Sequence, residues 1–226
     1  MIAAMRVLTW NLFHGRAKPP AGRPVLAEFS QTLAEWEWDV ALLQEVPPWW
    51  PPLLARAAGA PEHRTALTSR NHCLPLRRAI ARRKPDLIKS NGGGANALLA
   101  RVPLCGDHRQ AVLTRRPERR VVHGVALADG TWVVNLHAST HPAEQRRADL
   151  HAARDHALAW SAEAPLIFGG DLNSTRPRLD HLTVVASHWV DHVLVRGLES
   201  EGSGEVLDAG ILSDHRPLAV KLRRSA

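Results

Sequence analysis

Eight polar residues in the chain are of types that bind divalent cations or transfer protons, and most of them follow a short apolar run. They are Asn11, Glu45, His137, Asp171, Asn173, Asp191, Asp214 and His215. Carboxylates and amides supply the oxygen ligands that Mg²⁺ prefers, and histidine exchanges protons near neutral pH. If the strand ends converge, these residues could form one metal-binding and proton-transferring site.

Each of these residues also has an ordinary structural explanation. An asparagine after a strand is usually a turn residue, and the run from Asp171 to Asn173 could be a hydrogen-bonded turn. A glutamate that ends a strand is usually solvated, and a histidine on an apolar strand is more often a satisfied core group. Taken singly, the structural explanations are favoured, so the functional hypothesis depends on the joint order of the residues.

The elements expected to position these residues are mainly short strands. Apolar runs predict strands over 6–11, 39–45, 96–101, 110–115, 120–127, 131–138, 166–170, 189–195 and 216–222. Helices are predicted from Pro24 onward, over 48–58 and 76–83, from Pro142 to about 160, and over 177–186. Residues 91–94, Asn-Gly-Gly-Gly, are predicted to be a loop. Because strands outnumber helices, we expect an α/β fold with two sheets face to face and helices outside.

Seven segments, in order, resemble the motifs of the endonuclease/exonuclease/phosphatase superfamily, which includes deoxyribonuclease I, exonuclease III, neutral sphingomyelinases and inositol polyphosphate phosphatases. They are LTWN (8–11), LLQEV (42–46), NALLAR (96–101), VVNLH (133–137), GGDLN (169–173), VDHVLV (190–195) and SDHRPL (213–218). The segments LQE, GDLN and SDHRP in that order are a specific signal. The resemblance covers nearly the whole chain.

The resemblance implies a single domain over residues 1–226, folded as a four-layered α/β/β/α sandwich of two mixed sheets. It also implies Mg²⁺- or Mn²⁺-dependent hydrolysis of phosphoric esters. The implied metal ligands are Asn11, Glu45 and Asp214. The implied catalytic residues are His137, Asp171, Asn173, Asp191 and His215, with His215 paired to Asp191; whether Asp171 or His215 is the general base stays open.

The chain departs from the family pattern in ways that bear on its substrate. It contains no tyrosine, which disfavours an abasic-site specialist. No acidic partner for His137 is evident; Asn96 is the substitute candidate and is also a candidate substrate-binding residue. His192 follows Asp191 and is expected to point away from the site because alternate strand residues face opposite ways. His14, three residues beyond Asn11, could lie near the mouth of the site.

The charge of the chain favours an anionic substrate. The formal net charge is +7, and basic surfaces attract nucleic acids and other phosphorylated compounds. Between Glu45 and Asn96 lies a basic stretch that could clamp backbone phosphates or could be a solvated helix face. Its candidate substrate-binding residues are Arg77, Arg78, Arg82 and Arg83, flanked by Arg70 and Lys89. Trp49 and Trp50 could stack on bases, but packing under a loop is the favoured interpretation.

We therefore expect a nuclease acting on DNA or RNA. A phosphatase or phosphodiesterase for a small molecule or lipid head group is the first alternative, and an inactive binding module is the second. No apolar run is long enough to span a bilayer, and no secretory signal is evident. A cytoplasmic monomer is expected, with Cys73 and Cys105 as ordinary thiols.

Overall fold

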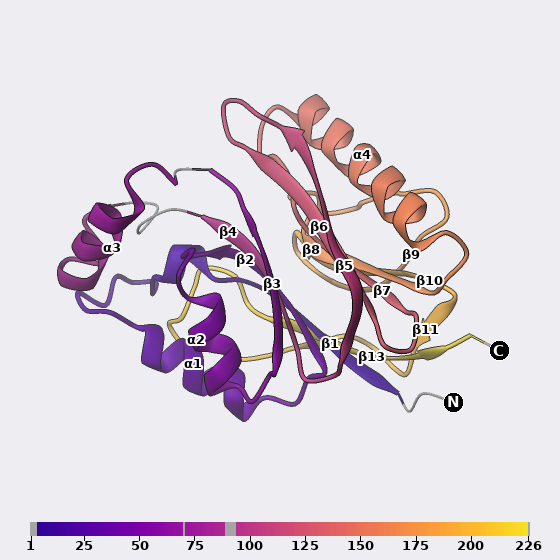
Figure 1. The fold of residues 1–226 in the computed structure, drawn as a ribbon, viewed down its shortest axis with the longest axis horizontal. Helices are drawn as coiled ribbons and strands as arrows, with labels where there is room; N and C mark the ends of the chain where they lie inside the picture. The colour runs from indigo at the N-terminus through magenta and orange to yellow at the C-terminus, as the bar shows by residue number, and fades with distance from the viewer. Residues whose placement is uncertain (1–3, 70, 89–93, 226) are drawn as a thin grey trace.

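The computed structural model describes residues 4–69, 71–88 and 94–225. Two β-sheets lie face to face, with α1 and α2 outside the first sheet and α4 outside the second (Figure 1). The helices are α1 (Leu26–Glu35), α2 (Pro51–Ala57), α3 (Leu74–Arg83) and α4 (Ala143–Ser161), with a 3₁₀ turn η1 (Phe13–Gly15). This confirms the predicted α/β sandwich. Arg70, Lys89 and most of the predicted loop at 91–94 lie outside the described residues.

The first sheet has the strand order β11-β13-β1-β2-β4-β3, with β12 also paired to β13. Its strands are β1 (Met5–Asn11), β2 (Val40–Val46), β3 (Glu62–Leu67), β4 (Ala95–Ala100), β11 (Leu198–Ser200), β12 (Glu205–Val206) and β13 (Leu218–Arg224). Only β1 and β2 run parallel here, with Asn11 beside Gln44. Parallel neighbours end at the same edge of a sheet, so Asn11 and Glu45 are brought together.

The second sheet has the order β5-β6-β7-β8-β10-β9. Its strands are β5 (Leu104–Thr114), β6 (Arg120–Leu127), β7 (Trp132–His137), β8 (Leu166–Asp171), β9 (Thr183–His188) and β10 (Asp191–Arg196). The parallel pair β7–β8 sets His137 beside Asp171. The antiparallel strand β10 sets Asp191 on the other side of Asp171. Both sheets are therefore mixed, as predicted.

Three apolar clusters form the layers of the core. Alternate residues of β1 and β2, such as Val7 and Leu42, are buried between the two sheets. Phe29 and Leu33 of α1 pack on the outer face of the first sheet, four residues apart and so on one face of the helix. Leu150 of α4 belongs to the cluster on the outer face of the second sheet. Rigid layers on both sides thus fix the strand ends.

One predicted helix is wrong, and four strands were not predicted. Residues 177–182 are turns and irregular backbone, and Thr183–His188 is the edge strand β9, which pairs with β10. The β-branched run from Thr183 to Val185 favours a strand, and it outweighs the helix-start signal of Pro177. The short strands β3, β11 and β12 gain their pairing from distant partners, which local sequence does not reveal.

A buried polar network joins the two sheets just behind the strand ends. Asn135 of β7 donates hydrogen bonds to the carbonyl oxygens of Leu43 and Ala97, at 3.0 and 2.9 Å. Gln44 donates to Asn135 Oδ1 at 2.8 Å. Both side chains are fully buried. The network fixes β7, which carries His137, against β2, which carries Glu45.

We predict that Asn135→Ala destabilises the protein by about 3 kcal/mol, because it leaves a cavity and removes the buried partner of Gln44. Urea denaturation followed by circular dichroism measures this. Thr183→Ala, on the exposed side of β9, should change the free energy of unfolding by less than about 0.5 kcal/mol. Equal effects of the two substitutions would contradict a stabilising role for the network.

Candidate active site

The predicted polar residues meet at one edge of the sandwich, where they line a pocket of about 240 Å³ that we call the strand-end pocket. The pocket receives residues from both sheets and from the loops that follow their strands. Its lining residues include Asn11, His14, Glu45, Glu118, Arg120, His137, Thr140, Asp171, Asn173, Asp214 and His215. Asp191 lies behind them in contact with His215. The structure therefore brings all eight candidates of the first group together.

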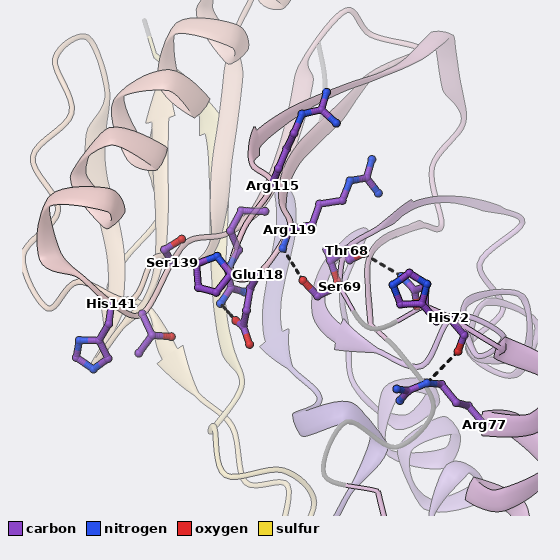
Figure 2. A pocket seen from close by; sticks show the side chains of 13 residues that line it. Thr68, Ser69, His72, Arg77, Arg115, Glu118, Arg119, Ser139 and His141 are labelled. Carbon is purple, nitrogen blue, oxygen red and sulfur yellow. Dashed lines mark hydrogen bonds and ion pairs between the residues drawn. The ribbon is translucent and has the colours of Figure 1, made fainter.

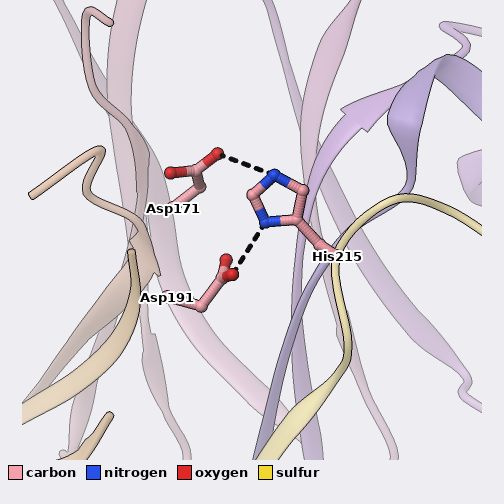
Figure 3. A group of neighbouring side chains, drawn as sticks. All are labelled: Asp171, Asp191 and His215. Atoms are coloured by element: carbon pink, nitrogen blue, oxygen red, sulfur yellow. Dashed lines mark hydrogen bonds and ion pairs between the residues drawn. The ribbon is translucent and has the colours of Figure 1, made fainter. Parts of the chain in front are cut away.

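Asp191, His215 and Asp171 form a chain of charged groups (Figure 3). His215 Nδ1 lies 2.7 Å from Asp191 Oδ2, and His215 Nε2 lies 3.8 Å from Asp171 Oδ2. Both aspartates are almost fully buried. The bond to Asp191 orients the imidazole so that Nε2 faces Asp171 and the strand-end pocket.

Opposing effects set the pKa values in this chain. Burial lowers the pKa of His215, but the hydrogen bond to Asp191 and the charges of Asp191 and Asp171 outweigh it and raise the pKa to about 9. Burial raises the pKa of Asp191 to about 6, although its bond to His215 opposes the rise. At neutral pH, His215 therefore carries a proton that it can donate through Nε2.

Asp171 is the point where the two sheets meet. Its Oδ2 accepts a hydrogen bond from Asn11 Nδ2 at 2.9 Å, and its Oδ1 accepts one from the backbone N–H of Asn173 at 3.0 Å. Burial raises the pKa of Asp171, whereas the charge of His215 and both hydrogen bonds oppose the rise. His137 Nε2 lies 3.4 Å from Asp171 Oδ2.

His137 has two acidic neighbours, Asp171 and Glu45, and Oε1 of Glu45 lies 3.9 Å from its Nδ1. Asn96, which the sequence offered as a substitute partner, does not take this place. Asn96 is 1% exposed and donates to the carbonyl oxygen of Val121. It does not line the strand-end pocket, so a substrate contact there is not what the geometry favours. Burial holds the pKa of His137 well below its usual value, which keeps the ring neutral.

Glu45 follows the buried run of β2 and projects into the strand-end pocket. Burial, with the nearby charge of Asp171, raises its pKa to about 7. His14 Nε2 lies 3.1 Å from Glu45 Oε2, and His14 lines the strand-end pocket. The sequence placed it only near the mouth of the site. Positive φ angles occur at Glu45 (51°), His14 (55°) and Asn173 (50°). Such strained conformations of non-glycine residues cluster at functional sites.

Ser213 was not among the sequence candidates, yet it positions three of them. Its hydroxyl donates to the carbonyl oxygen of Asn11 at 2.6 Å and accepts from the backbone N–H of His215 at 3.1 Å. It thus ties the loop that bears Asp214 and His215 to the end of β1. Asp214 is exposed at the rim of the strand-end pocket. The only sequence signal for Ser213 was its place in SDHRPL.

Arg120 was also missed, because it lies in a run of arginines without a distinguishing neighbour. It begins β6, its side chain is 8% exposed, and it pairs with Glu118 at 2.6 Å. Its charge lowers the pKa of both Glu45 and Asp171. A buried guanidinium at this pocket offers planar donors suited to a phosphate group.

Beside the strand-end pocket lies a larger hollow of about 860 Å³, which we call the basic cleft (Figure 2). The two share Glu118, Arg120 and Thr140. The other basic residues that line the cleft are His72, Arg77, Arg115, Arg119 and His141. In Figure 2, His141 lies across the cleft from His72 and Arg77. Six basic side chains against one carboxylate make the cleft attractive to anions.

The four predicted arginines of α3 have different surroundings. Arg77 lines the basic cleft. Arg78 lies over the ring of Trp49, 5.8 Å from its centroid. Arg82 and Arg83 are exposed at the end of α3 and line none of the pockets described here. A role for all four as one clamp therefore stays a prediction, with Arg77 as its best-placed member.

Trp50 and His192 serve the structure, whereas Trp189 is exposed beside the site. Trp50 is 5% exposed and packs on Phe29, in agreement with the packing interpretation. His192 lies away from the strand-end pocket, between Ser187 Oγ and the carbonyl oxygen of Ser174, at 2.8 and 2.6 Å. Trp189, which the sequence did not single out, is 64% exposed beside the His215 ring.

A family model agrees with this geometry. The model of the Endonuclease/Exonuclease/phosphatase family matches residues 8–215. The chain belongs to this family. The match runs from β1 to His215 and so includes every element that supplies a residue to the strand-end pocket. The endonuclease/exonuclease/phosphatase family consists of hydrolytic phosphoesterases, and divalent metals are general among its members.

Solved structures share the fold at low sequence identity. An endonuclease/exonuclease/phosphatase from Beutenbergia cavernae has a TM-score of 0.77 and 19% identity, covering 99% of this chain and 72% of that one. A mannosyl-6-phosphatase from Bacteroides thetaiotaomicron has a TM-score of 0.70 and 14% identity, and the match covers 97% of this chain and 99% of that one. TDP2 from Caenorhabditis elegans has a TM-score of 0.66 and 14% identity, and the match covers 97% of this chain and 75% of that one. A search of curated proteins finds no match. No helix in the described residues could span a membrane.

We predict that Asp191→Asn lowers the pKa of His215 from about 9 to below 6.5. The substitution removes the carboxylate that favours the imidazolium, whereas the burial that opposes it remains. Nuclear magnetic resonance titration of the histidine ring nitrogens in the metal-free protein measures this. If the pKa of His215 stayed near 9 in the variant, the charges of Asp171 and Asp214, and not that of Asp191, would be what keeps His215 protonated.

Proposed function

We propose that this protein is a divalent-metal-dependent phosphoesterase that hydrolyses phosphodiester bonds in nucleic acid. The observation that carries the proposal is the Asp191–His215–Asp171 chain, which faces a pocket continuous with the basic cleft through Arg120 and Thr140. Proton-transferring groups at one end of an anion-attracting channel suit hydrolysis of a phosphate ester within a longer polyanion.

The side chains divide the work between the attacking water and the phosphoryl group. Asp171 accepts hydrogen bonds from Asn11 and Asn173, which favour its carboxylate form and aim it into the strand-end pocket. We assign Asp171 to orient the attacking water and accept its proton. His215 keeps its own proton up to about pH 9, so we assign it to donate to a phosphoryl or leaving oxygen.

Neutral donors complete the assignment. His137 is held neutral by burial and can donate from one ring nitrogen. Asn173 Nδ2 already donates to the carbonyl oxygen of Ala138 at 2.9 Å, and an amide has a second N–H to offer. Donors fixed in this way stabilise charge that develops on phosphoryl oxygens, and one such donor can contribute about 3 kcal/mol. The fixed loops after β7 and β8 thus supply the preorganised contacts.

The donor set fits a divalent cation. The charges of Asp171 and Asp214 raise the pKa values of Glu45 and Asp191, which indicates an excess of negative charge that a cation would relieve. We assign Glu45, Asn11 and Asp214 as its ligands. Asn11 Oδ1 accepts from the N–H of Phe13 but retains a second lone pair. When bound, Mg²⁺ or Mn²⁺ would supply Lewis-acid stabilisation of the phosphoryl oxygens.

A second group of potential ligands lies nearby but is better explained by proton transfer. Asp171, Asp191 and His215 have ligand atoms within 4.8 Å of one another. However, His215 Nδ1 is already bonded to Asp191 at 2.7 Å, and its raised pKa marks a protonated ring, which cannot bind a metal. The cation is therefore assigned to the side of the pocket where Glu45 lies.

We expect metal-dependent hydrolysis of plasmid DNA and bis-(p-nitrophenyl) phosphate with Mg²⁺ or Mn²⁺, and none in EDTA. His215→Ala should lower kcat about 10²- to 10⁴-fold, because it removes a proton donor from the transition state. His156→Ala, on the exposed face of α4, is the matched control. Gel and absorbance assays measure both.

The substrates separate the alternatives. Hydrolysis of p-nitrophenyl phosphate without DNA cleavage would replace the nuclease with a phosphatase for a small molecule or lipid head group. Metal binding without hydrolysis of any ester would identify an inactive binding module. Retention of Glu45, Asp171 and His215 in one pocket disfavours that last outcome.

We predict that Mg²⁺ or Mn²⁺ raises the Tm of the protein and that Glu45→Gln abolishes this effect. Because the pKa of Glu45 is about 7, a proton competes with the cation, and affinity should fall by up to about tenfold per pH unit below 7. Thermal shift assays from pH 6 to 8.5 measure this. The control is Glu163→Gln, an exposed residue at the opposite end of β8. A Tm gain that persists in Glu45→Gln would refute this ligand assignment.

A further inference from the structure

A third hollow, of about 450 Å³, lies between the N-terminal half of α4 and the segment after Asn173; we call it the α4 pocket. Five basic residues line it, and none of its lining residues is acidic: they include Arg146, Arg147, His151, Arg176 and Arg178. Nothing in the proposed chemistry uses these residues. A concave surface with this charge is suited to a phosphate group.

The α4 pocket borders the strand-end pocket through adjacent residues. Asn173 lines the strand-end pocket, and the next residue, Ser174, lines the α4 pocket. On the other wall, Arg146 donates to the carbonyl oxygen of Thr140 at 2.8 Å, and Thr140 lines the strand-end pocket. A ligand in the α4 pocket would therefore lie next to the proposed scissile phosphate.

The segment that carries Arg176 and Arg178 is held in place. His192 donates from Nε2 to the carbonyl oxygen of Ser174 at 2.6 Å, and Pro177 and Leu179 are buried. Within the described residues, no carboxylate lies within ion-pair distance of Arg147, Arg176 or Arg178. Arg176 and Arg178 on this fixed segment and Arg147 on α4 thus line the pocket without a carboxylate of the described residues to neutralise them.

The basic cleft and the α4 pocket flank different strands. The cleft involves Arg115 and Arg120, at the end of β5 and the start of β6. The α4 pocket involves residues that follow β8 together with α4. In the sheet order β5-β6-β7-β8, the strand ends that bear His137 and Asp171 lie between them. Two cationic hollows therefore lie on either side of the catalytic groups.

We propose that the α4 pocket binds a backbone phosphate of the same nucleic-acid strand that occupies the basic cleft, so that the scissile bond is internal to the strand. This inference rests on the proposed nuclease function. Phosphates on both sides of the cleaved bond require a continuous strand, which an enzyme that acts only on ends does not need. The protein is thus an endonuclease with a phosphate path that runs from the cleft, across the strand-end pocket, to α4.

The test compares a triple variant, Arg147→Ala/Arg176→Ala/Arg178→Ala, with a control of equal charge, Lys221→Ala/Arg223→Ala/Arg224→Ala. The control residues lie on β13 toward the end that pairs with the start of β1, far along the strand from the site. Binding of a labelled 20-nucleotide strand is measured by anisotropy in EDTA over a range of salt concentrations. The triple variant should lose at least tenfold in affinity, with a salt dependence shallower by about one to two phosphate contacts. The control should match the wild type.

Cleavage assays then separate failure of this inference from failure of the proposed function. The wild type should nick covalently closed circular DNA, and the triple variant should show at least a tenfold lower ratio of DNA cleavage to bis-(p-nitrophenyl) phosphate hydrolysis. Degradation of linear but not circular DNA would overturn internal cleavage. An unchanged ratio and an unchanged salt dependence would overturn the α4 pocket as a phosphate site. No hydrolysis of any ester would instead refute the phosphoesterase proposal.

Discussion

The hydrogen bond from Asn11 to Asp171 joins the two sheets at the edge where their strands end. The first residue ends β1 of the first sheet and the second ends β8 of the other, 160 positions later in the chain. Behind this bond, Gln44 and Asn135 link β2 to β7 in the buried interior. Every catalytic assignment depends on these contacts, because a relative shift of the sheets would separate Glu45 and His215, on the side of the first sheet, from Asp171 of the second.

The same packing brings several carboxyl groups together in a buried site, and the proposed chemistry depends on this. Burial raises the pKa values of Glu45, Asp171 and Asp191, and the charge of Asp171 adds to the rise at Glu45 and Asp191. A folded protein tolerates such a group only where partners offset its desolvation. Here the offset comes from His215 and from Arg120, and it is incomplete at Glu45. The remaining negative charge would favour the divalent cation that we propose.

Much of this arrangement could be predicted from sequence because buried strands have a strong local signature. The apolar runs before Asn11 and Asp171 identified both the strands and the residues that project from their ends. The signature fails where tertiary pairing decides: Thr183–His188 is a strand because β10 lies beside it, although Pro177 favours a helix. It also fails for Arg120 and Ser213. Their roles come from interactions with groups distant in sequence, Glu45 and Asp171 for Arg120 and Asn11 for Ser213, which neither residue type nor spacing encodes.

The arginines also show the difference between what the local sequence indicates and what the fold brings together. The sequence drew attention to the dense run on α3, yet only Arg77 of that helix reaches the basic cleft. The other cations around the site come from separate segments, such as Arg115 before the β5–β6 turn and Arg176 after β8. Charge density along a chain therefore predicts affinity for anions better than it predicts where they bind. The location is fixed by which loops the two sheets bring to their common edge, and that edge is the one where β1, β2, β7 and β8 end.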